Sequence, residues 1–188
     1  TVSITETGFD FTANGTDNAL RSGVPVRFAI VVNGNGTMTI CDNSTGESGR
    51  LETKNYGYGT TKTILVDGNA IVNVNSGTIA ADYAAFYVVG FTGTSAVPAN
   101  APKPTLNVNG GKIFGQQLGI GIKGNTAILK VTGGEIIGKE YYGVSTNGTQ
   151  DWYDGGKFAI EITGGSIKSE DGPAMYLPAE GPTVITGG

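Results

Sequence analysis

The sequence contains no histidine at all and a single cysteine, Cys41. Histidine is the commonest general base and metal ligand of proteins, so its absence excludes every histidine-containing catalytic triad and metal site. A lone thiol cannot form a disulfide within the chain, and without a histidine partner we do not expect it to act as a nucleophile. These residues therefore predict no metal, no cofactor and no thiol-based catalysis.

Positive charge and long apolar runs are also scarce. The chain has 12 Lys and Arg against 16 Asp and Glu, a net charge of −4, and no basic stripe, so we expect no binding to nucleic acid. No stretch of about 20 apolar residues and no signal peptide is present, so we expect no membrane insertion. The first residue is Thr1, and the last residues begin another copy of a repeated motif, so we expect a piece of a longer product.

Glycine, in contrast, is abundant: it supplies 32 of the 188 residues, against the roughly 7% that is typical of proteins. The glycines lie between apolar segments, in the pattern apolar–x–apolar–(Asn or Thr)–(Gly or Ser)–Gly–x–Ile. Copies cover residues 72–79, 106–113, 129–136 and 160–167, and the chain ends in a further "ITGG". An irregular earlier copy runs from Met38 and Ile40 through a widened turn to Gly49-Arg50-Leu51.

The repeat predicts short strands. Its second glycines, Gly77, Gly111, Gly134, Gly165 and Gly188, are 34, 23, 31 and 23 residues apart. The alternation of apolar and polar positions indicates strands rather than helices, and a unit of 23 residues is shorter than a propeller blade of about 40–45 residues. A third strand in each unit is indicated by the apolar pairs Phe86/Val88, Ile120/Ile122, Tyr142/Val144 and Met175/Leu177.

Three short strands per unit predict an all-β fold, a single-stranded right-handed parallel β-helix of about five to six coils. Residues 28–188 would form this solenoid, and residues 1–27 would form an N-terminal cap over its open end. The predicted register places Lys130 beside Glu161 and Lys112 beside Glu135 on adjacent strands. It also stacks the asparagines 75 and 109 in a side-chain ladder.

The Ile/Val-Thr/Asn-Gly-Gly-x-Ile coils resemble the right-handed parallel β-helix domains, broadly pectate-lyase-like, of large secreted bacterial surface proteins. Similar domains occur in phage tailspikes and fibres. The resemblance covers about residues 28–188 and implies an extracellular location, on a cell surface or a virion surface. Because this architecture is shared by lyases, hydrolases, adhesins and spacers, the resemblance implies the fold and leaves the function open.

Irregular loops predict the place of a ligand site. The connections that follow the third strand of each unit span 18, 7, 16 and 6 residues, so long and short loops alternate at one corner. The loops 90–104 and 146–157 leave from coils two apart, roughly 10 Å along the axis, and the short turn 123–126 lies between them. Together they predict a cleft whose candidate ligand-binding residues are Phe91, Lys123, Asn125, Gln150, Asp151, Trp152, Tyr153 and Asp154.

An aromatic ring beside carboxylates and amides suits a sugar, because the ring covers the apolar C–H face and the polar groups bind hydroxyls. In one interpretation, Trp152 stacks on a polysaccharide or a host-surface glycan. The alternative is structural: Trp152 and Tyr153 would fold back on the rod and fix their own loop.

These features favour a non-catalytic domain that acts in structure, adhesion or display on a bacterial surface protein or phage appendage. The alternative is a polysaccharide lyase or glycoside hydrolase, a depolymerase, that uses the same cleft. A lyase would need clustered acidic residues for Ca²⁺ and a basic residue as proton acceptor, and only Asp151 and Asp154 suggest a carboxylate pair. The residue types thus assign no catalytic residue. The sequence allows a homo-oligomer but specifies no interface.

Overall fold

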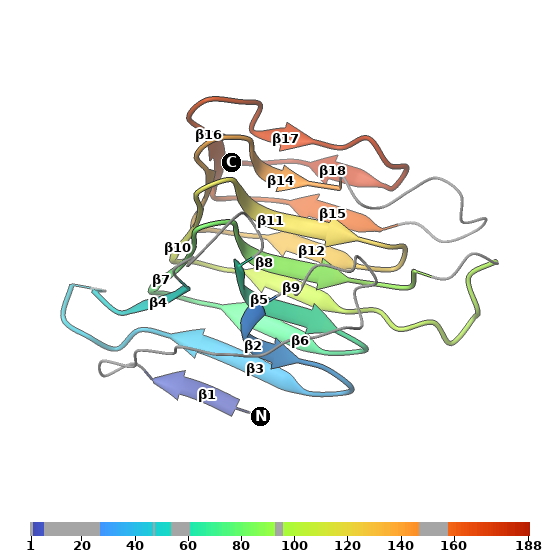
Figure 1. Ribbon diagram of the computed structural model, residues 1–188, viewed down its shortest axis with the longest axis horizontal. Coiled ribbons are helices and arrows are strands. Elements are labelled where there is room, and N and C mark those ends of the chain that lie inside the picture. The colour runs from blue at the N-terminus through green and yellow to red at the C-terminus, as the bar shows by residue number, and fades with distance from the viewer. Residues whose placement is uncertain (1, 6–26, 47, 54–60, 93–95, 147–157) are drawn as a thin grey trace.

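The computed structural model of the chain describes residues 2–5, 27–46, 48–53, 61–92, 96–146 and 158–188 (Figure 1). Within these ranges the protein is all-β, with eighteen strands in three parallel sheets and no helix. No membrane-spanning helix is therefore found in the described part of the chain. The cap predicted for residues 1–27 lies mostly outside these ranges and stays a prediction.

The largest sheet has seven strands in the order β1 (Val2–Thr5), β3 (Thr37–Cys41), β6 (Ile71–Val74), β9 (Thr105–Val108), β12 (Ile128–Val131), β15 (Ala159–Ile162) and β18 (Thr183–Ile185). A five-stranded sheet contains β4 (Arg50–Thr53), β7 (Thr78–Ala81), β10 (Lys112–Gly115), β13 (Glu135–Gly138) and β16 (Ser166–Ser169). A six-stranded sheet contains β2 (Arg27–Val32), β5 (Thr61–Asp67), β8 (Ala84–Val89), β11 (Leu118–Lys123), β14 (Tyr142–Ser145) and β17 (Met175–Tyr176).

From β3 onward the chain visits the seven-, five- and six-stranded sheets in that order and then repeats the cycle. We call one such cycle a pass. Each strand pairs in parallel with the equivalent strand of the next pass, so the passes stack from the N-terminal to the C-terminal end (Figure 1). This confirms the predicted all-β fold with parallel sheets, and the stacked passes are compatible with a solenoid.

The core lies between the three sheets and is built from the alternating apolar positions of the repeat. Ile113 and Ile136, from adjacent strands of the five-stranded sheet, are register partners and fully buried. Phe86 and Ile120 are partners in the six-stranded sheet and are also fully buried. The seven-stranded sheet contributes a buried column made of Val72, Val74, Leu106, Val108, Leu129, Val131, Ile160 and Ile162.

The repeated glycine pair forms the corner between the seven- and five-stranded sheets. Gly134 has a φ of 79°, in the left-handed region that favours glycine, and an added Cβ would lie 2.7 Å from the carbonyl oxygen of Gly110 in the preceding pass. At Gly133 an added Cβ would lie 2.4 Å from the carbonyl oxygen of Asn109. The glycines recur because each corner stacks tightly on the backbone of the corner in the preceding pass.

The predicted lateral pairs are confirmed. Lys130 and Glu161 are register partners with an Nζ–Oε2 distance of 3.6 Å, and Lys112 lies 3.4 Å from Glu135. Asn109 donates an amide hydrogen bond of 2.9 Å to Asn75, as the expected ladder requires.

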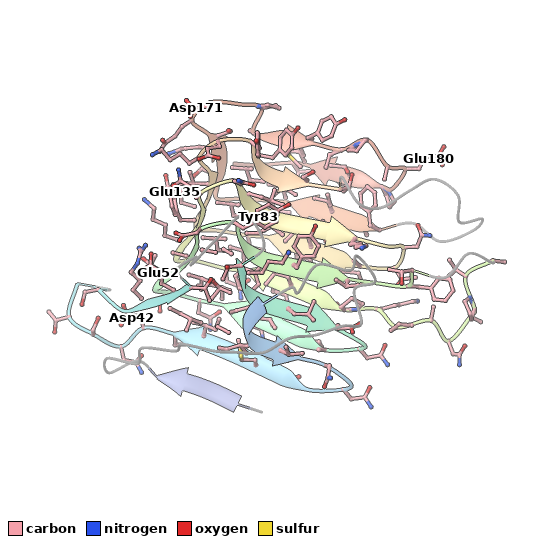
Figure 2. The ribbon with its side chains drawn as sticks, in the orientation of Figure 1. Asp42, Glu52, Tyr83, Glu135, Asp171 and Glu180 are labelled. Atoms are coloured by element: carbon pink, nitrogen blue, oxygen red, sulfur yellow. The ribbon has the colours of Figure 1, made fainter. Side chains whose placement is uncertain are left out.

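The irregular first copy is also confirmed. Met38 pairs with Val72 in the seven-stranded sheet, and Leu51 pairs with Ile79 in the five-stranded sheet. The widened turn between them is held by Asp42 (labelled in Figure 2), whose carboxylate accepts hydrogen bonds from the backbone N–H groups of Ser44 (2.8 Å) and Gly49 (2.6 Å). Because an ionised carboxylate is the better acceptor, the hydrogen bonds, with Ser44 first, lower the pKa of Asp42.

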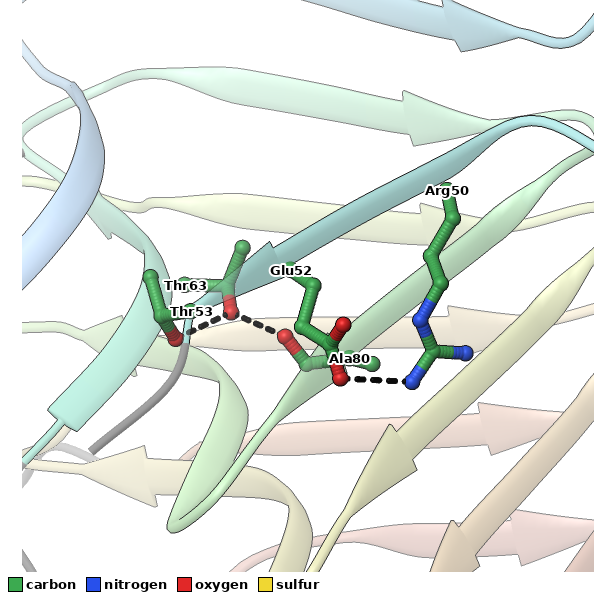
Figure 3. A network of polar contacts seen from close by, with 5 residues as sticks. All are labelled: Arg50, Glu52, Thr53, Thr63 and Ala80. Carbon is green, nitrogen blue, oxygen red and sulfur yellow. Dashed lines mark hydrogen bonds and ion pairs between the residues drawn. The ribbon is translucent and has the colours of Figure 1, made fainter. Parts of the chain in front are cut away.

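Polar side chains also join the five- and six-stranded sheets (Figure 3). The buried hydroxyl of Thr63 on β5 donates to the carbonyl oxygen of Ala80 on β7 (2.5 Å). The hydroxyl groups of Thr53 and Thr63 are 2.8 Å apart, so Thr53 is left as the donor of that pair. Each buried hydroxyl therefore has a partner, as burial in an apolar surrounding requires.

The alignment of the third-strand pairs, which the sequence predicts to within a residue or two, is shifted by two residues at one pair. The sequence pattern matched Tyr142/Val144 with Ile120/Ile122, but Val144 pairs with Ile120 and Tyr142 pairs with Leu118. Ile120 and Val144 belong to the core, whereas Leu118 and Tyr142 line a pocket outside it. Burial of a tyrosine hydroxyl in an apolar column would leave it without a partner, which favours the observed register.

Candidate functional site: a tyrosine-lined pocket

The candidate residues predicted from the sequence fall into two groups. Gln150, Asp151, Trp152, Tyr153 and Asp154 lie within residues 147–157, outside the described part of the chain. The cleft predicted between the two long loops is therefore not tested.

The second group, Phe91, Lys123 and Asn125, meets at one corner. Phe91 and Asn125 form an isolated antiparallel bridge, in which the backbone N–H of Asn125 donates to the carbonyl oxygen of Phe91 (2.8 Å). Lys123 ends β11 and pairs with Val89. Asn125 is buried, and its Nδ2 atom has no hydrogen-bond partner among the described residues. The short turn at 123–126 thus packs on the start of the 90–104 loop.

A pocket of about 250 Å³ lies on the outer face of the six-stranded sheet. Its lining residues come from three successive passes, those of β8, β11 and β14, and six of the seven carry a hydroxyl or an amide. They are Tyr83, Tyr87, Gln117, Leu118, Tyr141, Tyr142 and Ser145. Figure 2 labels Tyr83, which stands in the turn before β8.

Backbone stacking at the corner before the six-stranded sheet positions three of the pocket residues, one in each pass. The N–H of Leu118 donates to the carbonyl oxygen of Tyr83 (2.9 Å), and the N–H of Tyr141 donates to the carbonyl oxygen of Gln117 (3.1 Å). Tyr83, Gln117 and Tyr141 therefore occupy successive passes. With a strand spacing of roughly 4.8 Å, the backbones at Tyr83 and Tyr141 are about 10 Å apart, with Gln117 between them.

Gly121 shapes the floor of the pocket. It pairs with Tyr87 on one side and Ser145 on the other. A Cβ added at Gly121 would lie 2.5 Å from Cε2 of Tyr87 and 3.1 Å from Cδ2 of Leu118. The Tyr87 ring therefore extends across β11, over the space that a side chain at position 121 would occupy.

Lys62 lies on the neighbouring strand β5 and contacts two of the tyrosines. Its Nζ atom lies 4.8 Å from the ring centroid of Tyr83 and 4.8 Å from that of Tyr87. Burial, and to a lesser extent the positive charge of Lys123, lowers the pKa of Lys62 to about 8. Burial likewise raises the pKa of Tyr87 to about 12, and it raises the pKa of Tyr83. At neutral pH the site therefore holds protonated phenols around a cation.

The opposite side of the pocket is more open. Tyr141 is 52% exposed and lies 6.1 Å from Tyr142, measured between ring centroids. Tyr142 stacks on Tyr176 of the next pass, with centroids 4.8 Å apart and planes inclined by 17°. One face of Tyr142 is thus covered by Tyr176, while the remainder of its ring borders the pocket.

A second, larger depression of about 620 Å³ lies near the C-terminal end, beside Phe158, Leu177, Ala179, Glu180, Gly181, Pro182 and Thr183. Phe158 directly follows residues 147–157, so part of the surroundings of this depression is outside the described chain. Its described lining has one carboxylate, that of Glu180, and one aromatic ring. The tyrosine-lined pocket carries the denser set of groups that can bind a ligand.

Sequence reasoning missed the pocket residues. The sequence pattern predicts a core position for Tyr142 and gives no role to Tyr83, Tyr87 and Tyr141. One signal was available: tyrosines occur directly before the third strand of two units, at 83 and at 141. No sequence pattern indicates the role of Lys62, because its contacts depend on the register between β5 and β8.

Comparisons with protein-family models, with characterised proteins and with solved structures gave no match to this chain. Among the described residues, no group of three or more Cys, Asp or Glu side chains is placed to hold a metal ion. The geometry and chemistry of the pocket therefore carry the functional inference.

Proposed function

We propose that this chain is a right-handed parallel β-helix that acts as a non-catalytic adhesive or display domain and binds a saccharide in the tyrosine-lined pocket. Three parallel sheets visited in a fixed order support the β-helix. The setting that we propose is the surface of a bacterial cell or a phage particle. There, a regular rod would hold the pocket on one face.

The observation that carries the saccharide proposal is the composition of the pocket. Four tyrosines supply ring surface for the C–H faces of a sugar, and their hydroxyl groups, with Gln117 and Ser145, supply hydrogen-bond donors and acceptors. The volume of about 250 Å³ is below the roughly 300–1,000 Å³ of pockets for drug-sized ligands. We infer that it accommodates a short segment of a longer glycan chain.

A glycan array tests this proposal. It should carry linear hexasaccharides of glucose, galactose and mannose together with acidic polysaccharides, and the wild-type protein should bind at least one of them. Tyr141→Ala removes an exposed ring of the pocket and should reduce binding roughly tenfold or more, with little change in thermal stability.

Phe114→Ala is the matched control. Phe114 is a half-buried aromatic residue on the five-stranded sheet, where it pairs with Ala80 and Ile137. This variant should bind like the wild type. A wild-type protein that binds no glycan, or a Tyr141→Ala variant that binds as tightly as the wild type, contradicts the proposal.

The same reagents separate the proposal from the enzymatic alternative. A non-catalytic domain releases no unsaturated or reducing ends from the polysaccharides, even after long incubation. Release that is lost in Asp151→Ala or Asp154→Ala would favour a depolymerase and would place its chemistry in the 146–157 loop.

A further inference from the structure

Lys62 lies beside the pocket without lining it, as far as the described residues show. The Lys62 residue is only 6% exposed and sits on β5, one pass before the first tyrosines of the pocket. Its nitrogen is equidistant from the rings of Tyr83 and Tyr87, at 4.8 Å from each centroid. A cation at this distance is attracted to the electron-rich face of each ring, and burial strengthens the attraction.

The two rings reach the pocket from different backbone positions. Tyr83 belongs to the turn before β8, whereas Tyr87 projects from the middle of that strand and crosses above Gly121 of β11. Neither backbone position alone fixes the separation between the two rings. A single ammonium group in contact with both rings links their orientations.

We propose that Lys62 is a positioning residue of the pocket: its charged ammonium group holds the Tyr83 and Tyr87 rings in the arrangement that binds a saccharide. This inference rests on the proposed function of the same pocket. It assigns to Lys62 no contact with the ligand. Loss of its charge should loosen the two rings and weaken binding, while the other wall, formed by Tyr141 and Tyr142, stays in place.

Deprotonation provides a way to remove this charge without a mutation. With a pKa of about 8, Lys62 is mostly charged at pH 7 and mostly neutral at pH 9.5. The titratable and charged groups on the strands packed against β5 are Arg50 and Glu52 on β4, Tyr87 on β8, and Arg27 on β2, whose side chain lies outside the described part. Asp82 and Tyr83 stand in the turn between β7 and β8, and the positive charge of Lys123 on β11 also acts on Lys62.

The test compares saccharide affinity at pH 7 and pH 9.5. Neutral hexasaccharides of glucose, galactose and mannose are the probes, because their charge does not change between these pH values. The affinity of the wild type should fall roughly three- to tenfold at pH 9.5. Lys62→Arg stays charged and should bind equally at both pH values, whereas Lys62→Met should bind weakly at both.

Lys130→Met, on the seven-stranded sheet, is the matched control and should retain the pH dependence of the wild type. Equal wild-type affinity at pH 7 and pH 9.5, or Lys62→Met binding like the wild type at pH 7, overturns the role of Lys62. A wild type that binds no saccharide at either pH contradicts the proposed function itself, so the two failures are distinguishable.

A measurement on the wild type alone covers the case in which the Lys62 variants do not fold. In the ligand-free protein, the NMR signals of the Tyr83 and Tyr87 rings should shift with the same midpoint as the Lys62 Nζ signal. Ring signals that do not change while Lys62 titrates overturn the proposal.

Discussion

The outer faces of the seven-stranded and six-stranded sheets are built on the same core but carry different side chains. On the seven-stranded face, similar polar residues recur from pass to pass and bind one another: Asn107 donates to Asn73 (2.8 Å), and Thr132 donates to Asn109 (3.0 Å). On the six-stranded face, the column that contains Leu65 continues with Tyr87, Gly121, Ser145 and Tyr176.

The difference between the faces distinguishes a face that only stabilises the stack, on the seven-stranded sheet, from a face that carries the pocket, on the six-stranded sheet. A repeated polar residue satisfies its hydrogen bonds within the stack, so it has little left to offer a ligand. A column whose residues change in size at every pass leaves uneven surface, and on the six-stranded face this produces the pocket beside Gly121. Four predictions test this distinction, from the largest effect to the smallest.

The shared core should support both faces equally. Ile120 is fully buried between its partners Phe86 and Val144. Ile120→Ala should lower the free energy of unfolding by about 2–5 kcal/mol, because it removes buried methyl groups and leaves a cavity. Urea unfolding followed by circular dichroism measures this change, and a loss below about 1 kcal/mol would contradict the core position assigned to Ile120.

The pH dependence of stability should come largely from the six-stranded face. Because folding lowers the pKa of Lys62 from 10.5 to about 8, the unfolded chain binds more protons in this range. The free energy of unfolding therefore rises between pH 8 and 10.5, by at most about 3 kcal/mol. Because folding raises the pKa of Tyr87 from 10.0 to about 12, the opposite slope follows above pH 10.

Urea unfolding of the wild type between pH 7 and 11 should thus show rising and then falling stability. Lys62→Met should remove most of the rise, and Tyr87→Phe should reduce the fall. Lys130→Met, on the other face, is the control and should leave both slopes unchanged. A rise of the same size in Lys62→Met would show that Lys62 is not the group responsible.

Gly121→Ala should affect binding more than stability. The added methyl group meets the ring of Tyr87, at 2.5 Å from Cε2 before any adjustment, and a side-chain ring can move where backbone cannot. We expect Tyr87 to be displaced into the pocket, with roughly tenfold weaker saccharide binding and a change in unfolding free energy below about 1.5 kcal/mol. Calorimetric titration and urea unfolding measure the two quantities. Unchanged binding would show that Tyr87 does not shape the site.

Asn107→Ala on the seven-stranded face should affect stability more than saccharide binding. It removes the donor of the hydrogen bond to Asn73 and should cost about 1 kcal/mol of stability. Saccharide binding should stay within the error of the wild-type value. If binding fell with Asn107→Ala, the polar face would have to be included in the site, and the distinction between the two faces would fail.

Much of the scaffold could be predicted from the sequence, because local patterns determine it. The alternating apolar positions and glycine corners predicted the register that places Lys130 beside Glu161 and Asn75 beside Asn109. The contact of Lys168 with Glu135 (2.6 Å) was not predicted, since it joins positions that are not register partners.

The pocket could not be predicted in the same way. The periodicity that identifies inward residues suggested a core position for Tyr142, two residues away from the true alignment. The position of the Tyr87 ring depends on a missing side chain at Gly121 in another pass, and on Lys62 in a third. Such contacts arise between units of the repeat, where the sequence of one unit contains no information about its neighbour.

An NMR titration of the wild-type protein tests most directly whether the tyrosine-lined pocket is the ligand site. The hexasaccharide that binds best on the array is added while backbone amide signals are followed. We predict shifts at residues 117–121 and 141–145 of the six-stranded face and none at residues 105–109 and 128–132 of the seven-stranded face. Shifts confined to residues 147–157, or to the seven-stranded face, would contradict it.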